Sequence, residues 1–273
     1  MKNPVPVLGA ALQVDELQRM HNWVMERQRD LELQDFVTAE VLEGDWRAIV
    51  ERYRPLLNGH TGRIGIHGPF WGLDIATMDR DVREVVRKRL RQGLDVCGAL
   101  GATHMVVHSP YTTWDYNNLD NYDGAREGVI ERCHLAMADA VEQAEAIGCT
   151  LVIENIEDID PHIRVGLARS FDSERVRVSI DTGHAHYSHV TNGAPPVDYY
   201  VKAAGEMLSH VHLQDADGYA DRHWAPGEGT ILWRSVFAAV ARLDADPRLI
   251  LELRDKEKLV AATRYLEGLG VAC

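Results

Sequence analysis

Short apolar runs alternate with helical patterns along the whole chain, and this alternation constrains the fold more than any other feature of the sequence. Each run is apolar at nearly every position, which is typical of parallel strands that are buried on both faces. The eight predicted strands are residues 5–12, 31–37, 63–67, 104–108, 150–155, 176–181, 209–213 and 249–253. Between them, apolar residues recur at helical spacing, most clearly in residues 79–100, 125–147, 232–243 and 256–269. Eight repeated βα units predict an α/β fold, a single (β/α)8 TIM barrel.

No feature of the sequence divides this pattern into separate domains. The 273 residues contain no Ser/Gly-rich linker, low-complexity tract or shift in charge, so we expect one domain over residues 1–273. A doubly wound open sheet is the competing architecture. That fold would normally carry a G-x-G-x-x-G turn after its first strand, and the sequence has none there.

The composition narrows the choice of partners and compartment. The 29 Lys and Arg against 42 Asp and Glu give a formal net charge of −13, which argues against nucleic acid or an anionic membrane as a partner. The four cysteines show no C-x-x-C spacing, and neither a signal peptide nor a membrane span is recognisable, so we expect a cytoplasmic location. The oligomeric state stays open, a homo-oligomer included.

Six of the predicted strands end in a residue that can bind a metal ion. These residues are His67, His108, Glu154, Asp181, His212 and Glu252. In a (β/α)8 barrel the carboxyl ends of the strands meet at the face that carries the active site, so these side chains are expected to converge. A cluster of carboxylates stays ionised only if a cation compensates its charge. The convergence therefore predicts a divalent metal ion, and imidazole with carboxylate suits Mn, Mg, Co or Zn.

A second concentration of ligand-type residues lies in residues 210–233, HVHLQDADGYADRHWAPGEGTILW. His212 and Asp215 close the apolar run, and Asp221 and His223 follow at D-x-H spacing. A polar surface loop can have the same composition. The loop therefore supports a metal site only together with the strand ends.

The segments VIEN, DTGH, HVHL and DRHWAPGEG together resemble the xylose isomerase-like barrel superfamily, and the resemblance covers nearly the whole chain. That superfamily includes sugar isomerases, sugar epimerases, inosose dehydratases and the endonuclease IV group. The resemblance implies a central metal ion whose ligands are Glu154, Asp181, His212 and Glu252.

The endonuclease IV branch uses further ligands, and residues that match them are present in this chain. The resemblance assigns His67, His108, His184, Asp221 and His223 to additional metal or substrate contacts, so the number of metal ions stays open. Two motifs depart from that branch: Gly183 stands in DTGHAHYSH where the branch favours cysteine, and HLQDADG replaces its shorter HLND. The PGEGTILW ending is more similar to the sugar isomerases and epimerases.

The resemblance also implies proton transfer beside a carbonyl group. Glu154 and Glu252 belong to strands three apart in a ring of eight, so they would face each other across a small sugar or polyol chelated by the metal. One carboxylate would remove a proton and the other would return it, which gives an epimerase or an isomerase. The expected substrate contacts are Trp71, Trp114, Arg222, Trp224 and Arg254.

Other functions fit the same residues. Loss of hydroxide would make the site a lyase of the inosose dehydratase type, and a full multinuclear site would suit a phosphodiesterase resembling endonuclease IV. A carbohydrate-binding barrel without catalysis is the last alternative. In each case His210 is predicted to lie buried below His212, and Glu32 is a candidate partner in the barrel interior.

Overall fold

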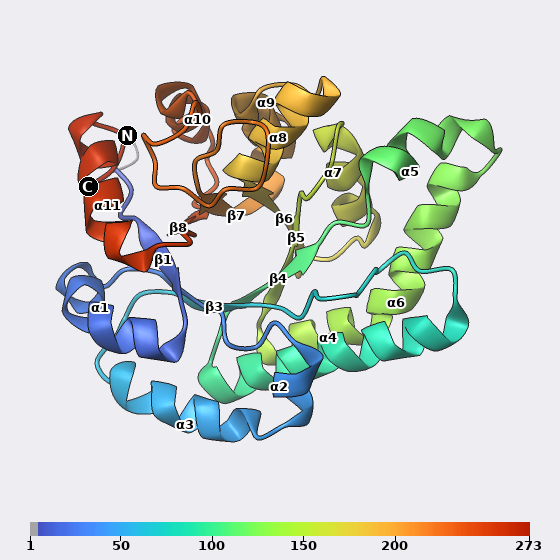
Figure 1. Cartoon of the computed structure of the whole chain (residues 1–273). Coiled ribbons are helices and arrows are strands. Elements are labelled where there is room, and N and C mark those ends of the chain that lie inside the picture. Colours follow the sequence, from blue (N-terminus) through green and yellow to red (C-terminus); the bar gives the residue numbers. More distant parts are fainter. Residues whose placement is uncertain (1–4) are drawn as a thin grey trace.

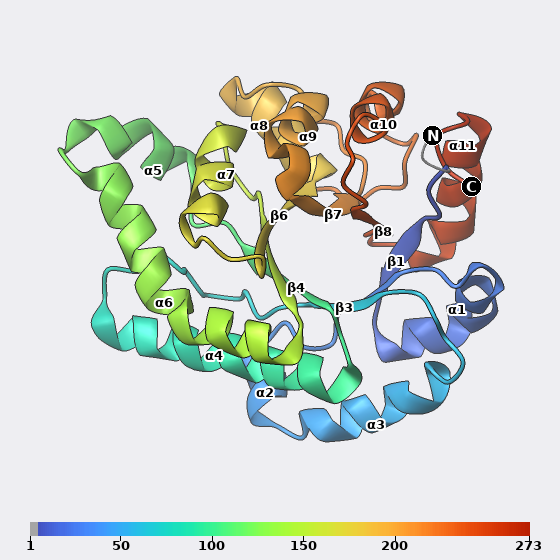
Figure 2. The same cartoon turned by 180° about the vertical axis from the view of Figure 1, so that it is seen from behind.

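The computed structural model describes residues 5–273, and its eight parallel strands form a closed barrel surrounded by helices (Figures 1 and 2). The strands follow one another around the barrel in sequence order, and β8 pairs with β1 to close it. They are β1 (Gly9–Leu12), β2 (Leu31–Leu33), β3 (Ile64–His67), β4 (His104–His108), β5 (Thr150–Glu154), β6 (Val176–Asp181), β7 (Leu208–Leu213) and β8 (Arg248–Leu251). This topology confirms the predicted (β/α)8 fold.

Helices cover the outside of the barrel. They are α1 (Val14–Arg27), α2 (Ala39–Glu43), α3 (Trp46–Leu56), α4 (Arg80–Leu100), α5 (Thr113–Asn118), α6 (Ala125–Ile147), α7 (Pro161–Ser170), α8 (Thr182–Asn192), α9 (Val197–Ala204), α10 (Trp233–Val240) and α11 (Leu259–Gly268). Short 3-10 turns are η1 (Leu119–Asn121), η2 (Gly205–Met207) and η3 (Lys256–Lys258). The two longest helices, α4 and α6, pack side by side against β3, β4 and β5 (Figure 1). Within residues 5–273, no helix combines the length and apolar character needed to cross a membrane.

Local sequence signals explain where the long helices begin and end. The carboxylate of Asp79 accepts hydrogen bonds from the first backbone N–H groups of α4, as an N-cap residue does. Gly101 and Gly148 follow α4 and α6 in the left-handed region, with φ of 66° and 71°, where a side chain would be strained. Both long helices therefore end before a buried strand starts.

The structure cuts back three predicted strands by at least two residues and places a helix directly after β6. The first strand begins at Gly9 and not at residue 5. The second strand ends at Leu33 because Asp35 leaves the sheet and accepts the backbone N–H of Val14 at the start of α1. The eighth strand ends at Leu251, so Glu252 projects from the first position beyond it. Helix α8, which the apolar periodicity did not indicate, begins directly after β6 because Asp181 accepts the backbone N–H of His184 at 2.7 Å.

Candidate metal centre and active site

Four acid and imidazole side chains from consecutive strand ends meet at the mouth of the barrel. Glu154 ends β5, Asp181 ends β6, His212 lies near the end of β7, and Glu252 follows β8. All four residues are buried, and each offers one ligand atom within 4.8 Å of the other three. The four residues that the resemblance assigned to the central metal are therefore neighbours in space.

The free oxygen atoms of this central set fit a divalent cation. Glu154 Oε2 and Asp181 Oδ2 are buried without a hydrogen-bond partner, a costly arrangement for carboxylate oxygens. Burial raises the pKa of Asp181 to about 6. A cation bound between three carboxylates and one imidazole would remove both penalties, and this oxygen-rich donor set suits Mn, Mg, Co or Zn.

His212 is the only basic group in the central set, and its Nδ1 atom lies between two carboxylates. Its Nδ1 lies 2.6 Å from Glu154 Oε1 and 3.4 Å from Glu252 Oε2. Burial on its own lowers the pKa of His212, but the carboxylates of Glu252, Glu32 and Glu154 outweigh it and hold the pKa well above the ordinary value. A proton on His212 therefore offsets part of the negative charge in the metal-free site.

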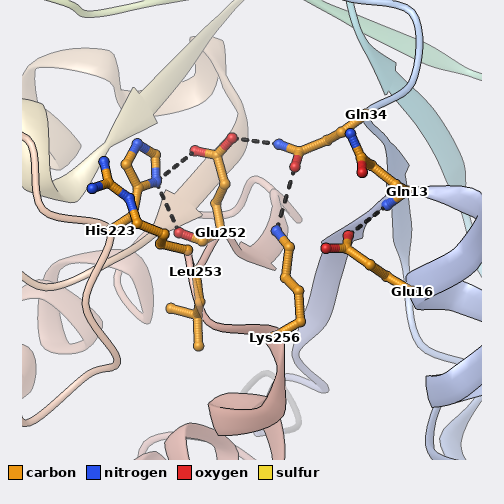
Figure 3. A pocket seen from close by; sticks show the side chains of 8 residues that line it. Gln13, Glu16, Gln34, His223, Glu252, Leu253 and Lys256 are labelled. Carbon is orange, nitrogen blue, oxygen red and sulfur yellow. Dashed lines mark hydrogen bonds and ion pairs between the residues drawn. The ribbon is translucent and has the colours of Figure 1, made fainter.

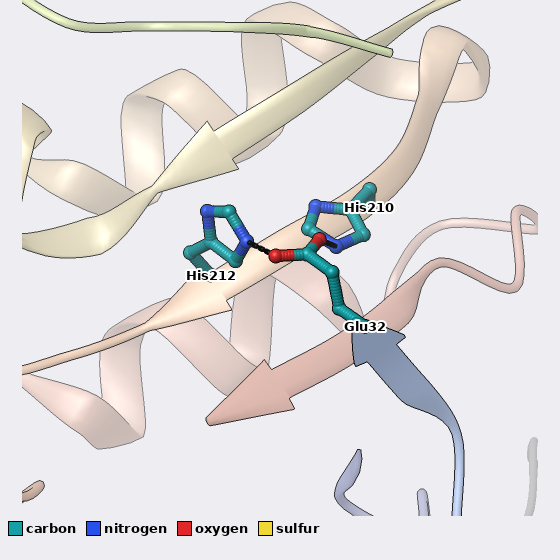
Figure 4. A group of neighbouring side chains, drawn as sticks. All are labelled: Glu32, His210 and His212. Carbon is teal, nitrogen blue, oxygen red and sulfur yellow. Dashed lines mark hydrogen bonds and ion pairs between the residues drawn. The ribbon is translucent and has the colours of Figure 1, made fainter. Parts of the chain in front are cut away.

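A buried layer below the central set fixes the orientation of His212 (Figure 4). Glu32 on β2 accepts a hydrogen bond from His212 Nε2 at 2.9 Å and lies 3.0 Å from His210 Nε2. His210 Nδ1 in turn contacts Ser179 Oγ at 2.8 Å, and all four residues are fully buried. A carboxylate behind a ligating imidazole fixes its tautomer and direction, so Nδ1 is left to face the central set. These contacts confirm the predicted positions of His210 and Glu32.

Two further histidines flank Glu154. His67 Nε2 and His108 Nε2 each lie 3.7 Å from Glu154 Oε2. The ring of Phe70 stacks on His108 with 4.4 Å between centroids and shields that side from water. Burial lowers the pKa of His108 to about 3, so its imidazole is neutral at physiological pH.

A second flanking group lies on the opposite, more open side. Asp221 Oδ1 is 3.5 Å from His184 Nε2, and Asp221 Oδ2 is 3.0 Å from His223 Nε2. Burial lowers the pKa of His223, but its hydrogen bond to Asp221 and the nearby carboxylates outweigh burial and raise that pKa to about 9. For His184, burial is likewise outweighed, by Asp181 and Asp221, and the pKa is well above its usual range. The five additional residues named from the resemblance thus form two separate groups beside the central set.

Gln214 connects the second flanking group to the central set, and the sequence patterns gave no sign of it. Its amide nitrogen donates to Asp181 Oδ1 at 3.2 Å and to Asp221 Oδ1 at 2.7 Å, while its oxygen accepts the backbone N–H of His223. A Cβ atom at Gly183 would lie 2.2 Å from the Gln214 side chain. Glycine in DTGH therefore makes room for the glutamine of HLQD, which links the two departures from the endonuclease IV motifs.

Asp215 does not join the metal-ligand groups, contrary to the expectation for residues 210–233. Its buried carboxylate accepts hydrogen bonds from the backbone N–H groups of Ala216, Gly227 and Ile231 and from Trp233 Nε1. These bonds hold together both ends of the loop that carries Asp221 and His223. Asp215 thus organises the loop and has no free oxygen lone pair directed at the site.

The side chains expected to contact substrate differ in their surroundings. Trp71 and Trp114 are 67% and 75% exposed, so they stand in solvent at the barrel mouth. Arg222 is paired with Asp217 at 2.8 Å and lies over the ring of Trp224. Arg254 lines a cavity beside Glu252. The sequence patterns did not indicate that Gln34 and Lys256, which line the same cavity, belong to the site.

The family profile described as the xylose isomerase-like TIM barrel matches residues 31–270. The chain belongs to this family. Among characterised relatives, a fructoselysine 3-epimerase of Escherichia coli O157:H7 is 28% identical over 105 residues, 37% of either chain. An uncharacterised protein of Methanocaldococcus jannaschii is 24% identical over 212 residues, 75% of this chain and 69% of its own length.

Solved structures of other proteins have the same fold. A D-tagatose 3-epimerase-like protein superposes with a TM-score of 0.76 at 20% identity, over 96% of each chain. A Thermus thermophilus protein soaked with zinc chloride gives a TM-score of 0.70 at 25% identity, over 96% of this chain and 98% of its own. The barrel of this chain is thus shared with relatives along nearly its full length.

Proposed function

We propose that this protein is a divalent-metal-dependent epimerase or isomerase of a small sugar or related polyol. The observation that carries the proposal is the pair Glu154 and Glu252, which reach the same His212 Nδ1 from different sides of one buried site. The family membership and the two epimerase-named relatives support a sugar as the substrate. A carboxylate pair beside a chelated carbonyl is suited to remove and return a proton.

The metal ligands in this proposal are Glu154, Asp181, His212 and Glu252. When bound there, a divalent ion supplies Lewis acidity that polarises a carbonyl group and stabilises developing negative charge on its oxygen. Glu32 keeps His212 Nδ1 directed at the centre, and Gln214 keeps Asp181 in place through the 3.2 Å hydrogen bond.

In the metal-free site, one oxygen atom of each proposed catalytic glutamate accepts a hydrogen bond. With a divalent ion bound, each glutamate would use one oxygen atom as a metal ligand and the other to exchange a proton. His212 Nδ1 holds Glu154 Oε1, while Glu154 Oε2 is without a hydrogen-bond partner. Gln34 Nε2 donates to Glu252 Oε1 at 2.5 Å, which leaves Glu252 Oε2 toward the centre, 3.4 Å from His212 Nδ1. One glutamate takes the proton from the carbon beside the carbonyl. The other, protonated at the start, donates its proton to the opposite face of that carbon for epimerisation. For isomerisation it donates the proton to the former carbonyl carbon, while the proton of the neighbouring hydroxyl group passes to the former carbonyl oxygen.

Proton transfer is tested with ketohexoses such as D-tagatose and D-fructose in deuterium oxide. Metal-loaded protein is expected to place deuterium at the carbon beside the carbonyl, and Glu252→Gln is expected to reduce turnover by at least about 1000-fold. Glu257→Gln is the control, because Glu257 is exposed and lies five residues further along the same loop. Full activity of Glu252→Gln would contradict the proposed role, and release of water with a dicarbonyl or enone product would identify a lyase.

A second candidate function rests on the two flanking groups. With the central set they supply nine ligand-type residues, enough for more than one metal ion, as in a phosphodiesterase of the endonuclease IV type. The similar fold of the zinc-soaked protein is compatible with zinc at such a site. Counting metal ions per chain and assaying cleavage of abasic DNA distinguishes the two candidates: one ion without cleavage supports the sugar enzyme, and three ions with cleavage support the hydrolase.

A further inference from the structure

A cavity of about 270 Å³ opens beside Glu252, and its lining includes neither His67 nor His108 (Figure 3). Gln34, which follows β2, and Lys256 of η3 lie next to each other in its wall. Arg254 also lines it. Its size suits a small polar fragment, since pockets for larger organic ligands begin at about 300 Å³. Because Glu252 forms one wall, a substrate at the metal centre would extend into this space.

Lys256 carries an ammonium group that lacks an anionic partner. Its Nζ reaches Gln34 Oε1 at 3.4 Å, a long hydrogen bond to a neutral amide, and no carboxylate of the described residues lies within ion-pair distance. An ammonium group has three N–H donors, so two remain without a protein acceptor. Lys256 is partly buried. Burial lowers its pKa, while the carboxylates of Glu252, Glu16 and Glu32 raise it and leave it below the ordinary value.

Arg254 adds a second cation to the same cavity. Its backbone N–H donates to His223 O at 3.0 Å, which fixes the start of the side chain, while the exposed guanidinium forms no ion pair with residues 5–273. Other cations of this region are paired: Lys258 contacts Glu228 at 2.6 Å and Arg222 contacts Asp217 at 2.8 Å. Lys256 and Arg254 are thus two neighbouring cations that form no ion pair with a carboxylate of residues 5–273, although the cavity that they line is part of an acidic chain.

The two carboxylates that line the cavity already have other partners. Glu16 Oε2 accepts the backbone N–H of Gln13 at 2.8 Å and caps α1, where the helix dipole offsets its charge. Glu252 belongs to the central set, where the metal would compensate it. Lys256 and Arg254 therefore leave the cavity with uncompensated positive charge when the centre is loaded.

We propose that this cavity binds an anionic group, a carboxylate or a phosphate, on the far end of the substrate. This proposal rests on the proposed function, because it places the rest of the substrate at the metal centre. Lys256 donates hydrogen bonds to the anion from the inner side, and Arg254 adds a flexible second contact from the rim. The site therefore distinguishes an anionic sugar derivative from a neutral sugar of the same length.

Calorimetric titration of the metal-loaded full-length protein with three unreactive polyols tests the proposal. The probes are D-glucitol, D-glucitol 6-phosphate and D-gluconate, at an ionic strength of about 0.15 M, where exposed charges are screened as in a cell. At least one anionic probe is expected to bind about 10-fold or more tightly than D-glucitol, since a hydrogen bond to a charged group contributes about that factor. Comparing the phosphate with the carboxylate identifies the preferred anion.

Two variants test whether Lys256 is responsible for the tighter binding of the anionic probe. Lys256→Met is expected to remove most of this advantage, whereas Lys258→Met, which alters an exposed and paired lysine two residues away, is expected to keep it. Equal binding of all three probes, binding of none, or an advantage that survives in Lys256→Met would overturn the proposal. In each of those cases deuterium exchange into a neutral ketohexose still reports separately on the proposed function.

Discussion

The two histidine groups that flank the central carboxylates share a residue type but differ in how they hold protons. Beside Glu154, burial under Phe70 lowers the pKa of His108 to about 3, so this side offers a neutral ring. On the other side, the half-exposed Asp221 outweighs burial and raises the pKa of His223 to about 9. A metal ion can bind a neutral imidazole directly, but on the Asp221 side it must first displace protons. Two histidines of the same site can therefore differ in whether they are ready to bind a metal ion, because their pKa values determine whether the imidazole is already neutral.

The largest expected effect comes from removing the carboxylate of Glu154, which belongs to the central set and also contacts the first flanking group, His67 and His108. Glu154→Ala is expected to weaken binding of the central metal at least about 100-fold, because loss of a partner behind a ligand already costs roughly 10- to 100-fold. Calorimetric titration of the metal-free protein with Mn²⁺ measures this loss. Asp221→Ala provides the contrast, since it changes the second group and is expected to leave the tightest binding event intact. Equal losses in both variants would contradict the separation of the two groups.

A smaller effect on stability is expected from pH through the second flanking group. Protonated His223 stabilises the metal-free fold below pH 6.5, and this contribution is lost as pH rises from 6.5 through its folded pKa of about 9. The loss is on the order of 1–3 kcal/mol, which urea unfolding at several pH values in the presence of chelator can measure.

The Asp221→Asn variant tests the origin of this slope. It is expected to flatten the change between pH 6.5 and 9, because the His223 pKa then moves toward its ordinary value. Asp217→Asn is the matched control, since Asp217 lies in the same loop but pairs with Arg222. A slope that is unchanged in Asp221→Asn would mean that another group titrates in this range.

The smallest expected effect is that of a substitution at Gly183, which lies against Gln214 between the central set and the second flanking group. In Gly183→Ala the new methyl group overlaps the buried Gln214, which must move away from Asp181 and Asp221. We expect a loss of about 1–3 kcal/mol in the free energy of unfolding, as for other overpacked sites. Gly166→Ala on α7 is the control, because its Cβ would meet no atom within 4 Å. An equal change in both variants would contradict the proposed role of Gly183.

The barrel and the strand-end ligands could be predicted from the sequence because both follow from simple periodicity. Buried parallel strands are apolar almost throughout, so Glu154 and Asp181 stand out where the apolar runs end. The closed barrel then brings such residues to one face whatever their separation in the chain. This rule predicts the convergence of the strand-end residues, whereas the choice of four of them as one central set came from the resemblance to the family.

The cavity and the loop contacts could not be predicted, because they depend on side-chain directions between distant segments. Gln34 and Lys256 are 222 residues apart and meet only after β8 closes against β1. Asp215 is of a residue type that can bind metal ions. Its carboxylate instead accepts hydrogen bonds from three backbone N–H groups of its own loop and from Trp233 Nε1, so its role is structural. Helix α8 lacks a clear apolar periodicity and depends on its cap, Asp181.

The hydrogen bond between Gln34 and Glu252 spans the seam of the barrel. β1 and β8 join there through two residue pairs, and the amide of Gln34 reaches past β1 from β2 to the carboxylate that follows β8. Transient opening of that seam would withdraw the amide from Glu252 while Glu154, Asp181 and His212 stayed together on their three adjacent strands. The pairing of β1 with β8 therefore helps to keep Glu252, one of the two residues proposed to carry a proton, in its orientation toward the centre.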